Sequence, residues 1–254
     1  MLRARVIPCL LLRNGGLVKT VKFGDARYVG DPINAVRIFN DKEVDELVFL
    51  DIAATPSGQG PNFELLADIA SEAFMPFGYG GGITTIDQVQ RLFALGIEKV
   101  ILNTSAASSP ALVEEAARLA GNSSVVVSMD VRRNWLGKYS VCVAGGKTDT
   151  MRDPVSYAQE MERSGAGEIL LTAIQRDGTM EGYDLELVRR VSAAVSIPVV
   201  ASGGAGNLQH LKAAIDSGAS AVGAGSLFVF HGKHRAVLIT YPTYTELERL
   251  FAGS

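Results

Sequence analysis

The chain has 254 residues, of which 47% are hydrophobic, and a formal net charge of −3. This is enough for a large core in one domain or two, and the small negative charge argues against nucleic acid as a partner. Cys9 and Cys142 both lie in apolar runs, which indicates reduced thiols of a cytosolic protein. Because no apolar run approaches about 18 residues and the N-terminus lacks a cleavage site, we expect a soluble cytoplasmic protein outside the membrane.

Eight short apolar runs follow one another along the chain, each closed by a turn and followed by a helical pattern. They cover residues 6–11, 47–52, 76–80, 99–103, 124–130, 168–174, 197–202 and 220–225. Continuous β-branched runs of this kind are typical of parallel strands that are buried on both faces. Eight such strands alternating with helices predict an α/β fold, a single (β/α)8 TIM barrel. The alternative is an open doubly wound sheet, but no GxGxxG motif opens the first helix.

The barrel is predicted to be one domain, 1–254, built from two duplicated half-barrels of about 1–122 and 123–254. A constant shift aligns residues 46–104 with 168–226 without a gap, so that Glu46 falls on Glu168. A comparison of the segments just upstream places Leu11 opposite Asp130. One half therefore ends its first strand with a carboxylate and the other ends it with a leucine.

Two connections, roughly 13–30 and 131–152, are longer than the about 2–6 residues usual in α/β units. Both follow the first strand of a half, on the barrel face where active sites are built. Each contains a Gly-Gly pair flanked by residues that favour strands, at 15–16 and 145–146. We interpret them as hairpin lids, the alternative being loops without a function.

Glycine-rich turns follow the third and the seventh run, as GGGI at 80–83 and SGGAGN at 202–207. Such turns let backbone amides approach an anion, and the helix that follows adds positive potential. The next strand in each half ends in a small polar pair. We therefore predict two phosphate sites, and a ligand with phosphates at both ends, held by Gly81, Gly82, Asn103, Thr104, Gly203, Gly204, Gly225 and Ser226. The alternative is that the glycines serve only the turns.

Three carboxylates, Asp51, Asp130 and Asp177, lie at or just past strand ends and are predicted to face the same mouth. A carboxylate there can act as a general acid or base if its pKa moves toward neutrality. We predict Asp130 and Asp177 as catalytic and Asp51 as a substrate ligand, although Asp177 could equally cap a turn. Lys19, in the first lid, is a further candidate, although an isolated loop lysine is more often solvated. The histidines have neither metal spacing nor a nucleophile partner, so we predict no metal site, no cofactor and no catalytic triad.

Four charged residues, Arg5, Glu46, Lys99 and Glu168, each open an apolar strand. Strand starts lie at the bottom of a barrel, so inward-pointing side chains would form a ring of two positive and two negative charges. From spacing alone, four unrelated surface charges are the simpler interpretation.

Over essentially its whole length the chain resembles the cyclase subunit of imidazole glycerol phosphate synthase. The matching stretches are DELVFLDI, GGGI, KVILNT, GAGEILLT, RDGT, GYD and IPVVASGGAG. The resemblance implies a half-barrel duplication, a doubly phosphorylated substrate and a glutaminase subunit docked at the barrel bottom. It also implies that ammonia from this partner passes a salt-bridged gate, which Arg5, Glu46, Lys99 and Glu168 match residue for residue.

The chain also departs from the family's sequence pattern. The family works with two catalytic aspartates, of which Asp130 matches the second while Leu11 occupies the first position. The family's DRDG is here QRDG, with Gln175 in place of its first acid. Losing one of two acid–base partners commonly lowers the rate by several orders of magnitude, so whether the chain is itself an enzyme stays open.

With its matched gate and its departures at Leu11 and Gln175, the chain resembles a paralogous branch linked to acetamidino sugars of bacterial surface polysaccharides. The resemblance implies an ammonia-channelling subunit that helps a glutaminase feed a separate sugar amidotransferase, which converts an acetamido to an acetamidino group. Two alternatives are kept: an active cyclase subunit, a lyase of histidine biosynthesis, and a scaffold that binds a phosphosugar without catalysis.

Overall fold

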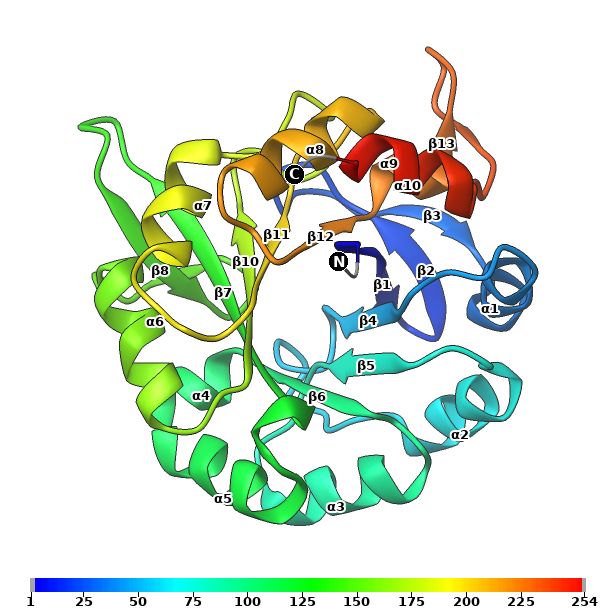
Figure 1. Cartoon of the computed structure of the whole chain (residues 1–254). Helices are drawn as coiled ribbons and strands as arrows, with labels where there is room; N and C mark the ends of the chain where they lie inside the picture. The colour runs from blue at the N-terminus through cyan, green and yellow to red at the C-terminus, as the bar shows by residue number, and fades with distance from the viewer. Residues whose placement is uncertain (1–2, 253–254) are drawn as a thin grey trace.

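The computed structural model describes residues 3–252 and contains eight parallel strands around one axis (Figure 1). Each strand is hydrogen-bonded in register to the next, and the last pairs with the first, Arg5 opposite Ala221. The barrel strands are β1 (Arg5–Arg13), β4 (Leu47–Asp51), β5 (Phe77–Gly80), β6 (Lys99–Leu102), β7 (Val125–Arg133), β10 (Glu168–Ala173), β11 (Val199–Ser202) and β12 (Ala221–Ala224). The predicted (β/α)8 barrel is therefore confirmed.

Helices follow the strands and surround the barrel. They are α1 (Pro32–Asp41), α2 (Phe63–Glu72), α3 (Ile86–Ala94), α4 (Thr104–Ser108), α5 (Pro110–Ala120), the 3₁₀ turn η1 (Asn122–Ser124), α6 (Pro154–Arg163), α7 (Leu185–Ser192), α8 (Leu208–Asp216), α9 (Ser226–Val229) and α10 (Tyr244–Phe251). Capping residues next to the helices determine where the helices begin. Asp31 and Asp153 each accept a hydrogen bond from the first turn of a helix that begins with proline, which is preorganised for that position.

Apolar side chains form two separate clusters, as expected for a closed barrel. The larger lies between the strands and the helices. The smaller fills the barrel interior and consists of Ile7, Cys9, Val48, Ile101, Val126, Leu170, Val200 and Ala221, with Leu50 packed against it. The inside of the barrel is thus a packed apolar column and not an open pore.

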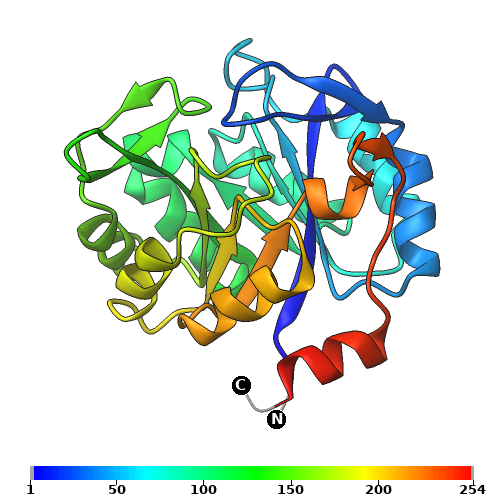
Figure 2. The ribbon, with the colours of Figure 1, turned by 90° about the horizontal axis from the view of Figure 1, so that it is seen from above.

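Both long connections fold as hairpins at one end of the barrel. β1 turns back into β2 (Gly16–Lys19), which pairs with β3 (Arg27–Gly30). β7 turns back at residues 134–138 into β8 (Tyr139–Val143), which pairs with β9 (Thr148–Asp149). A third, smaller hairpin joins β13 (Phe230–His231) to β14 (Ala236–Val237). Figure 2 shows that the start of β1 and the helix α10 lie at the opposite end of the barrel.

None of the helices between residues 3 and 252 is both long enough and apolar enough to span a bilayer.

Candidate active site

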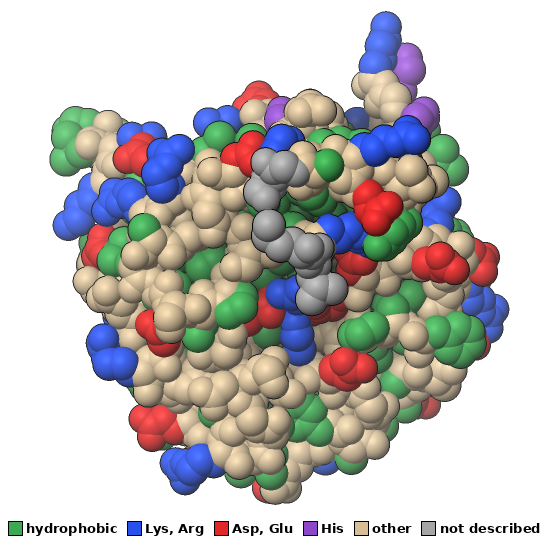
Figure 3. All heavy atoms as spheres, viewed as in Figure 1, with side chains coloured by type: hydrophobic (Ala, Val, Ile, Leu, Met, Phe, Trp, Pro, Cys, Tyr) green, Lys and Arg blue, Asp and Glu red, His purple; other side chains and the backbone are tan. Residues whose placement is uncertain are grey.

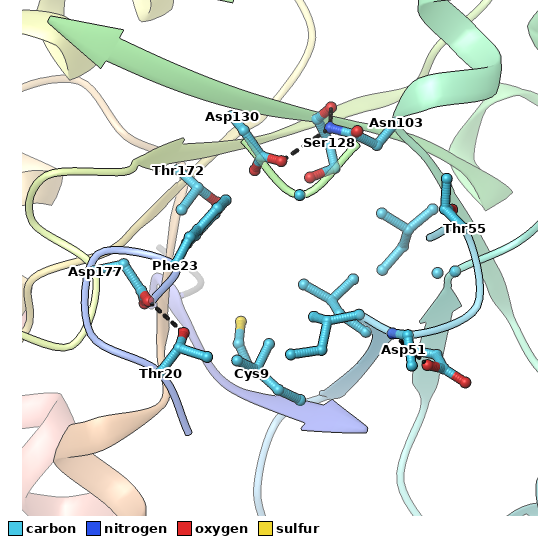
Figure 4. A pocket seen from close by; sticks show the side chains of 18 of the residues that line it. Cys9, Thr20, Phe23, Asp51, Thr55, Asn103, Ser128, Asp130, Thr172 and Asp177 are labelled. Carbon is cyan, nitrogen blue, oxygen red and sulfur yellow. Dashed lines mark hydrogen bonds between the residues drawn. The ribbon is translucent and has the colours of Figure 1, made fainter. Parts of the chain in front are cut away.

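A cavity of about 640 Å³ opens at the carboxyl ends of the barrel strands, between the two long hairpins. All the predicted catalytic and phosphate-binding residues line it, namely Lys19, Asp51, Gly81, Gly82, Asn103, Thr104, Asp130, Asp177, Gly203, Gly204, Gly225 and Ser226. Figure 4 shows the polar side chains converging from several strands. The topology therefore brings together residues that are far apart in the sequence, and their roles stay predictions.

Asp130 lies near the end of β7 with only 9% of its surface exposed. Its carboxylate accepts one side-chain hydrogen bond, from Asn103 Nδ2 at 3.2 Å. Burial, with a smaller contribution from the negative charge of Asp177, raises the pKa of Asp130 to about 7 despite that hydrogen bond. A carboxyl group with such a pKa can both give and take a proton near neutral pH.

Asp177 forms an ion pair with Lys19, whose Nζ lies 2.8 Å from Asp177 Oδ1, and both side chains are buried. Thr20 Oγ1 donates to the other carboxylate oxygen at 3.0 Å, and the amide of Lys22 donates to the Asp177 carbonyl. The first hairpin is therefore attached to the loop after β10. Lys19 is not the solvated loop lysine of the simpler interpretation.

Phe23 was not predicted, and it enters the cavity from the first hairpin beside Thr172 and Asp177 (Figure 4). Lys22 and Phe23 both have left-handed backbone conformations, with φ of 53° and 59°. Two successive non-glycine residues in this region carry strain, of order 1 kcal/mol or more each. No residue type in this segment signals the conformation, so sequence patterns could not have found it.

The wall on the side of the first half is apolar. Leu11 lies opposite Leu50 of β4 in the strand register, and both line the cavity with Cys9. Burial raises the pKa of the Cys9 thiol to about 12, so this thiol stays protonated at neutral pH. Neither Leu11 nor Cys9 can therefore replace a second carboxylic acid in proton transfer.

Asp51 ends β4 at the rim of the cavity. Its Oδ1 accepts hydrogen bonds from the amides of Ala53 and Ala54, and Figure 4 shows its carboxylate directed away from Asp130 and Asp177. The structure thus gives Asp51 a turn-capping contact that strand-end position alone does not reveal.

The glycine pairs have positive φ in both halves, at Gly81 and Gly82 and at Gly203 and Gly204. A Cβ atom at Gly82 would lie 2.4 Å from the Gln59 carbonyl, and one at Gly204 would lie 2.2 Å from the Gly182 carbonyl. Glycine is therefore needed for these turns whether or not an anion binds.

Ser226 gives a separate indication of a ligand. Its side chain is buried, and its Oγ has no hydrogen-bond partner among the described residues. Buried hydroxyl groups are normally paired, and a polar group bound on the cavity side would supply the missing partner. In the other half, Thr104 Oγ1 accepts from the amide of Ala144 and joins this site to the second hairpin.

The four charged residues at the barrel bottom form a closed ring. Arg5 is paired with Glu46 and, at 3.1 Å, with Glu168, while Lys99 lies 2.8 Å from Glu46 and 2.9 Å from Glu168. Burial alone would lower the pKa of Arg5, but the two carboxylates raise it above its ordinary value. The predicted ring is present, directly below the apolar column, whereas its role as a gate is untested. Figure 3 shows blue and red side chains together at the centre of this face.

We expect Asp130→Asn to change the pH dependence of stability. Between pH of about 4 and 7 the folded state keeps a proton that the unfolded Asp130 has released, so the free energy of unfolding falls as pH rises. Asparagine does not titrate, so the free energy of unfolding of the variant does not fall in this way. The variant should be more stable than the wild type at pH 8, by on the order of 3 kcal/mol, but about equal to it at pH 4. Urea unfolding from pH 4 to 8 measures the difference, and parallel curves for the two proteins would contradict it.

The family model described as "Histidine biosynthesis protein" matches residues 5–235. The chain belongs to this histidine biosynthesis protein family.

Relatives within the family cover nearly the whole chain. The "Putative imidazole glycerol phosphate synthase subunit hisF2" of Pseudomonas aeruginosa is 52% identical over 249 residues, 98% of this chain and 99% of that protein. A protein of Leptospira borgpetersenii with the name "Putative imidazole glycerol phosphate synthase subunit HisF" is 47% identical over 253 residues, 99% of this chain and all of that protein. The "Imidazole glycerol phosphate synthase subunit HisF" of Alkaliphilus metalliredigens is 43% identical, over 91% of this chain and 92% of its own.

Proposed function

We propose that this chain is the ammonia-channelling barrel subunit of a glutamine-dependent complex similar to imidazole glycerol phosphate synthase. A glutaminase docks at the bottom of the barrel, and the ammonia that leaves the mouth converts an acetamido group of a surface-polysaccharide sugar to an acetamidino group. The observation that carries the proposal is the contrast between the two ends of the barrel. The charged ring is complete, whereas the mouth has Leu11 where a second acid would be needed.

The apolar side chains of the barrel interior favour neutral ammonia over the ammonium ion. Above the ring the column consists of apolar side chains such as Ile7, Val48 and Leu170. An ammonium ion would lose its hydration there without compensation, whereas neutral ammonia loses much less. The ring itself offers carboxylate oxygens and cationic N–H groups at the lower entrance, where a small polar molecule can exchange hydrogen bonds.

The residues at the mouth of the barrel do not favour the family's ring-closing chemistry. Proton transfer on two sides of a substrate requires two groups; burial raises the pKa of Asp130 to about 7, whereas Leu11, in the place of the second acid, cannot transfer a proton. Amidine formation is a net condensation: the nitrogen of ammonia forms a C=N bond to the amide carbon, the C–O bond breaks, and the oxygen leaves as water with two hydrogens of ammonia. We assign this step to a separate sugar amidotransferase, so it does not require a second acid in this barrel.

The purified chain, mixed with its glutaminase, tests this function. The barrel should raise glutaminase activity, yet show no ammonia-dependent turnover of the family's bisphosphate substrate above about 1% of an ordinary cyclase. Turnover at ordinary cyclase rates would overturn the proposal. Lys99→Met, assayed where it stays folded, should lose this stimulation, and the matched control Arg118→Met, which removes an exposed cation, should keep it.

An active cyclase subunit is the second candidate, because the pKa of Asp130 lies near 7 and the Lys19–Asp177 pair lies across the same cavity. If this candidate is correct, the chain will restore growth without histidine to a deletion strain that lacks its own cyclase. A strain that still requires histidine, while the folded chain accumulates in it, would exclude it.

A further inference from the structure

The hairpin formed by β7 and β8 carries two large apolar side chains at its tip. Trp135 is 90% exposed and Leu136 is 70% exposed. Figure 1 shows this hairpin projecting beyond the helices at the upper left, and Figure 2 shows it at the end of the barrel opposite α10. In Figure 3 the same projection bears hydrophobic side chains with lysine or arginine beside them. An exposed tryptophan at a tip contributes nothing to the core of its own chain, whereas tryptophan is enriched at the centres of protein interfaces.

The tip is held in one conformation by its own hydrogen bonds. Asn134 Oδ1 accepts from the amides of Leu136 and Lys138, at 3.0 and 2.9 Å, and the Asn134 amide donates to the Lys138 carbonyl. Arg133 Nε donates to the Gly137 carbonyl and its guanidinium lies over the ring of Tyr139. A preordered tip loses little conformational entropy when it binds, which favours binding.

Gln175 holds the hairpin next to its turn, at Arg133. Its Nε2 donates to the Arg133 carbonyl at 2.7 Å, and its Oε1 accepts from the Arg133 amide at 3.2 Å. A side-chain amide can make both bonds, but a carboxylate has no proton to donate to the carbonyl. The glutamine that departs from the family's pattern is therefore joined to the hairpin and not to the chemistry of the cavity.

Charge indicates the chemistry of what binds. Residues 131–149 contain four cations, Arg132, Arg133, Lys138 and Lys147, and one acid, Asp149. Lys138 flanks the tip, whereas Arg133 is paired with Glu186 at 3.5 Å and Lys147 lines the cavity. An apolar tip with cations on this side fits an apolar pocket with an acidic rim, since complementary charge steers association and limits wrong partners.

We propose that this hairpin tip is the docking site for the enzyme that consumes the ammonia. The inference rests on the proposed function, because ammonia that leaves the mouth must reach its acceptor without escaping into solvent. The glutaminase of that proposal occupies the other end of the barrel, so the acceptor has to cover the mouth. Trp135 and Leu136 anchor it there, and Gln175 is a positioning residue that keeps the hairpin in place.

The test compares glutamine-dependent with ammonia-dependent amidation in a mixture of the chain, its glutaminase and the acetamido-sugar amidotransferase. For Trp135→Ala/Leu136→Ser we expect the glutamine-dependent rate to fall at least tenfold. The rate with saturating ammonium chloride, and the glutaminase activity, should both stay unchanged. Both side chains are exposed, so the variant will fold, and Leu119→Ala on the outer helix α5 is the matched control with an exposed apolar residue.

If the double variant shows the same glutamine-dependent amidation rate as the wild type, the docking proposal is overturned. If the wild-type chain forms dimers that the double variant does not form, the tip pairs with a second copy and the proposal is again overturned. If the wild-type mixture cannot use glutamine at all, the proposed function fails, whatever Trp135 does.

Gln175→Glu tests the positioning role. We expect amide hydrogen exchange at residues 133–139 to become faster and the glutamine-dependent rate to fall severalfold, with the ammonium chloride rate unchanged. Unchanged exchange and coupling would remove Gln175 from the proposal.

Discussion

Lys99→Met is expected to destabilise the folded chain by about 3–5 kcal/mol, the usual effect of breaking a buried charge pair. Glu46 and Glu168 are only 4% and 6% exposed, and each is paired with Lys99 as well as with Arg5. Without Lys99 the ring changes from neutral to a net charge of −1, and Arg5 alone has to compensate for two buried carboxylates. Urea unfolding at neutral pH measures the loss.

Two controls separate this effect from loss of packing. Lys99→Met/Glu46→Gln restores a neutral ring and should recover much of the lost stability. Arg118→Met removes a cation from an exposed pair with Glu114 on helix α5 and should change stability by about 0.5 kcal/mol or less. If Lys99→Met and Arg118→Met have equal effects, the ring is not the buried network that its geometry indicates.

The barrel could be predicted from the sequence because its signals are local and repeated. Continuous apolar runs, glycine turns and capping residues such as Asp31 and Asp153 recur in the order in which strands and helices follow one another. The ring was harder to predict. Spacing places Arg5 and Lys99 at strand starts but does not say whether their side chains point inward, and only the family resemblance indicated that they do.

The pairing of side chains in the mouth could not be predicted. Lys19 and Asp177 are 158 residues apart, and their ion pair depends on how the first hairpin packs on the loop after β10. The pKa of Asp130 depends on burial, which a strand-end position does not fix. Gln175 was correctly singled out as a departure, but its contact with Arg133 depends on the fold of the hairpin.

The second large effect expected is a gain of function from Leu11→Asp. If the missing acid alone limits the mouth, this variant should raise ammonia-dependent cyclase activity by about 100-fold or more, the usual contribution of a positioned general acid or base. Leu11 lines the same cavity as Asp130 and is partly exposed to it, so a carboxylate can be accommodated there without being buried in the core. Turnover of the family's bisphosphate substrate, with ammonium chloride as the nitrogen source, measures the gain.

Leu11→Asn is the matched control, because it has nearly the same size and polarity as the aspartate but cannot transfer a proton. A gain shared by both variants would show that polarity or space limits the reaction, and not proton transfer. If neither variant gains activity, a missing acid is not the only barrier, and the first hairpin, with Phe23 in the cavity, becomes the next element to change. That result would favour the ammonia-channelling function, since both the missing acid and the first hairpin would then prevent the family's ring closure.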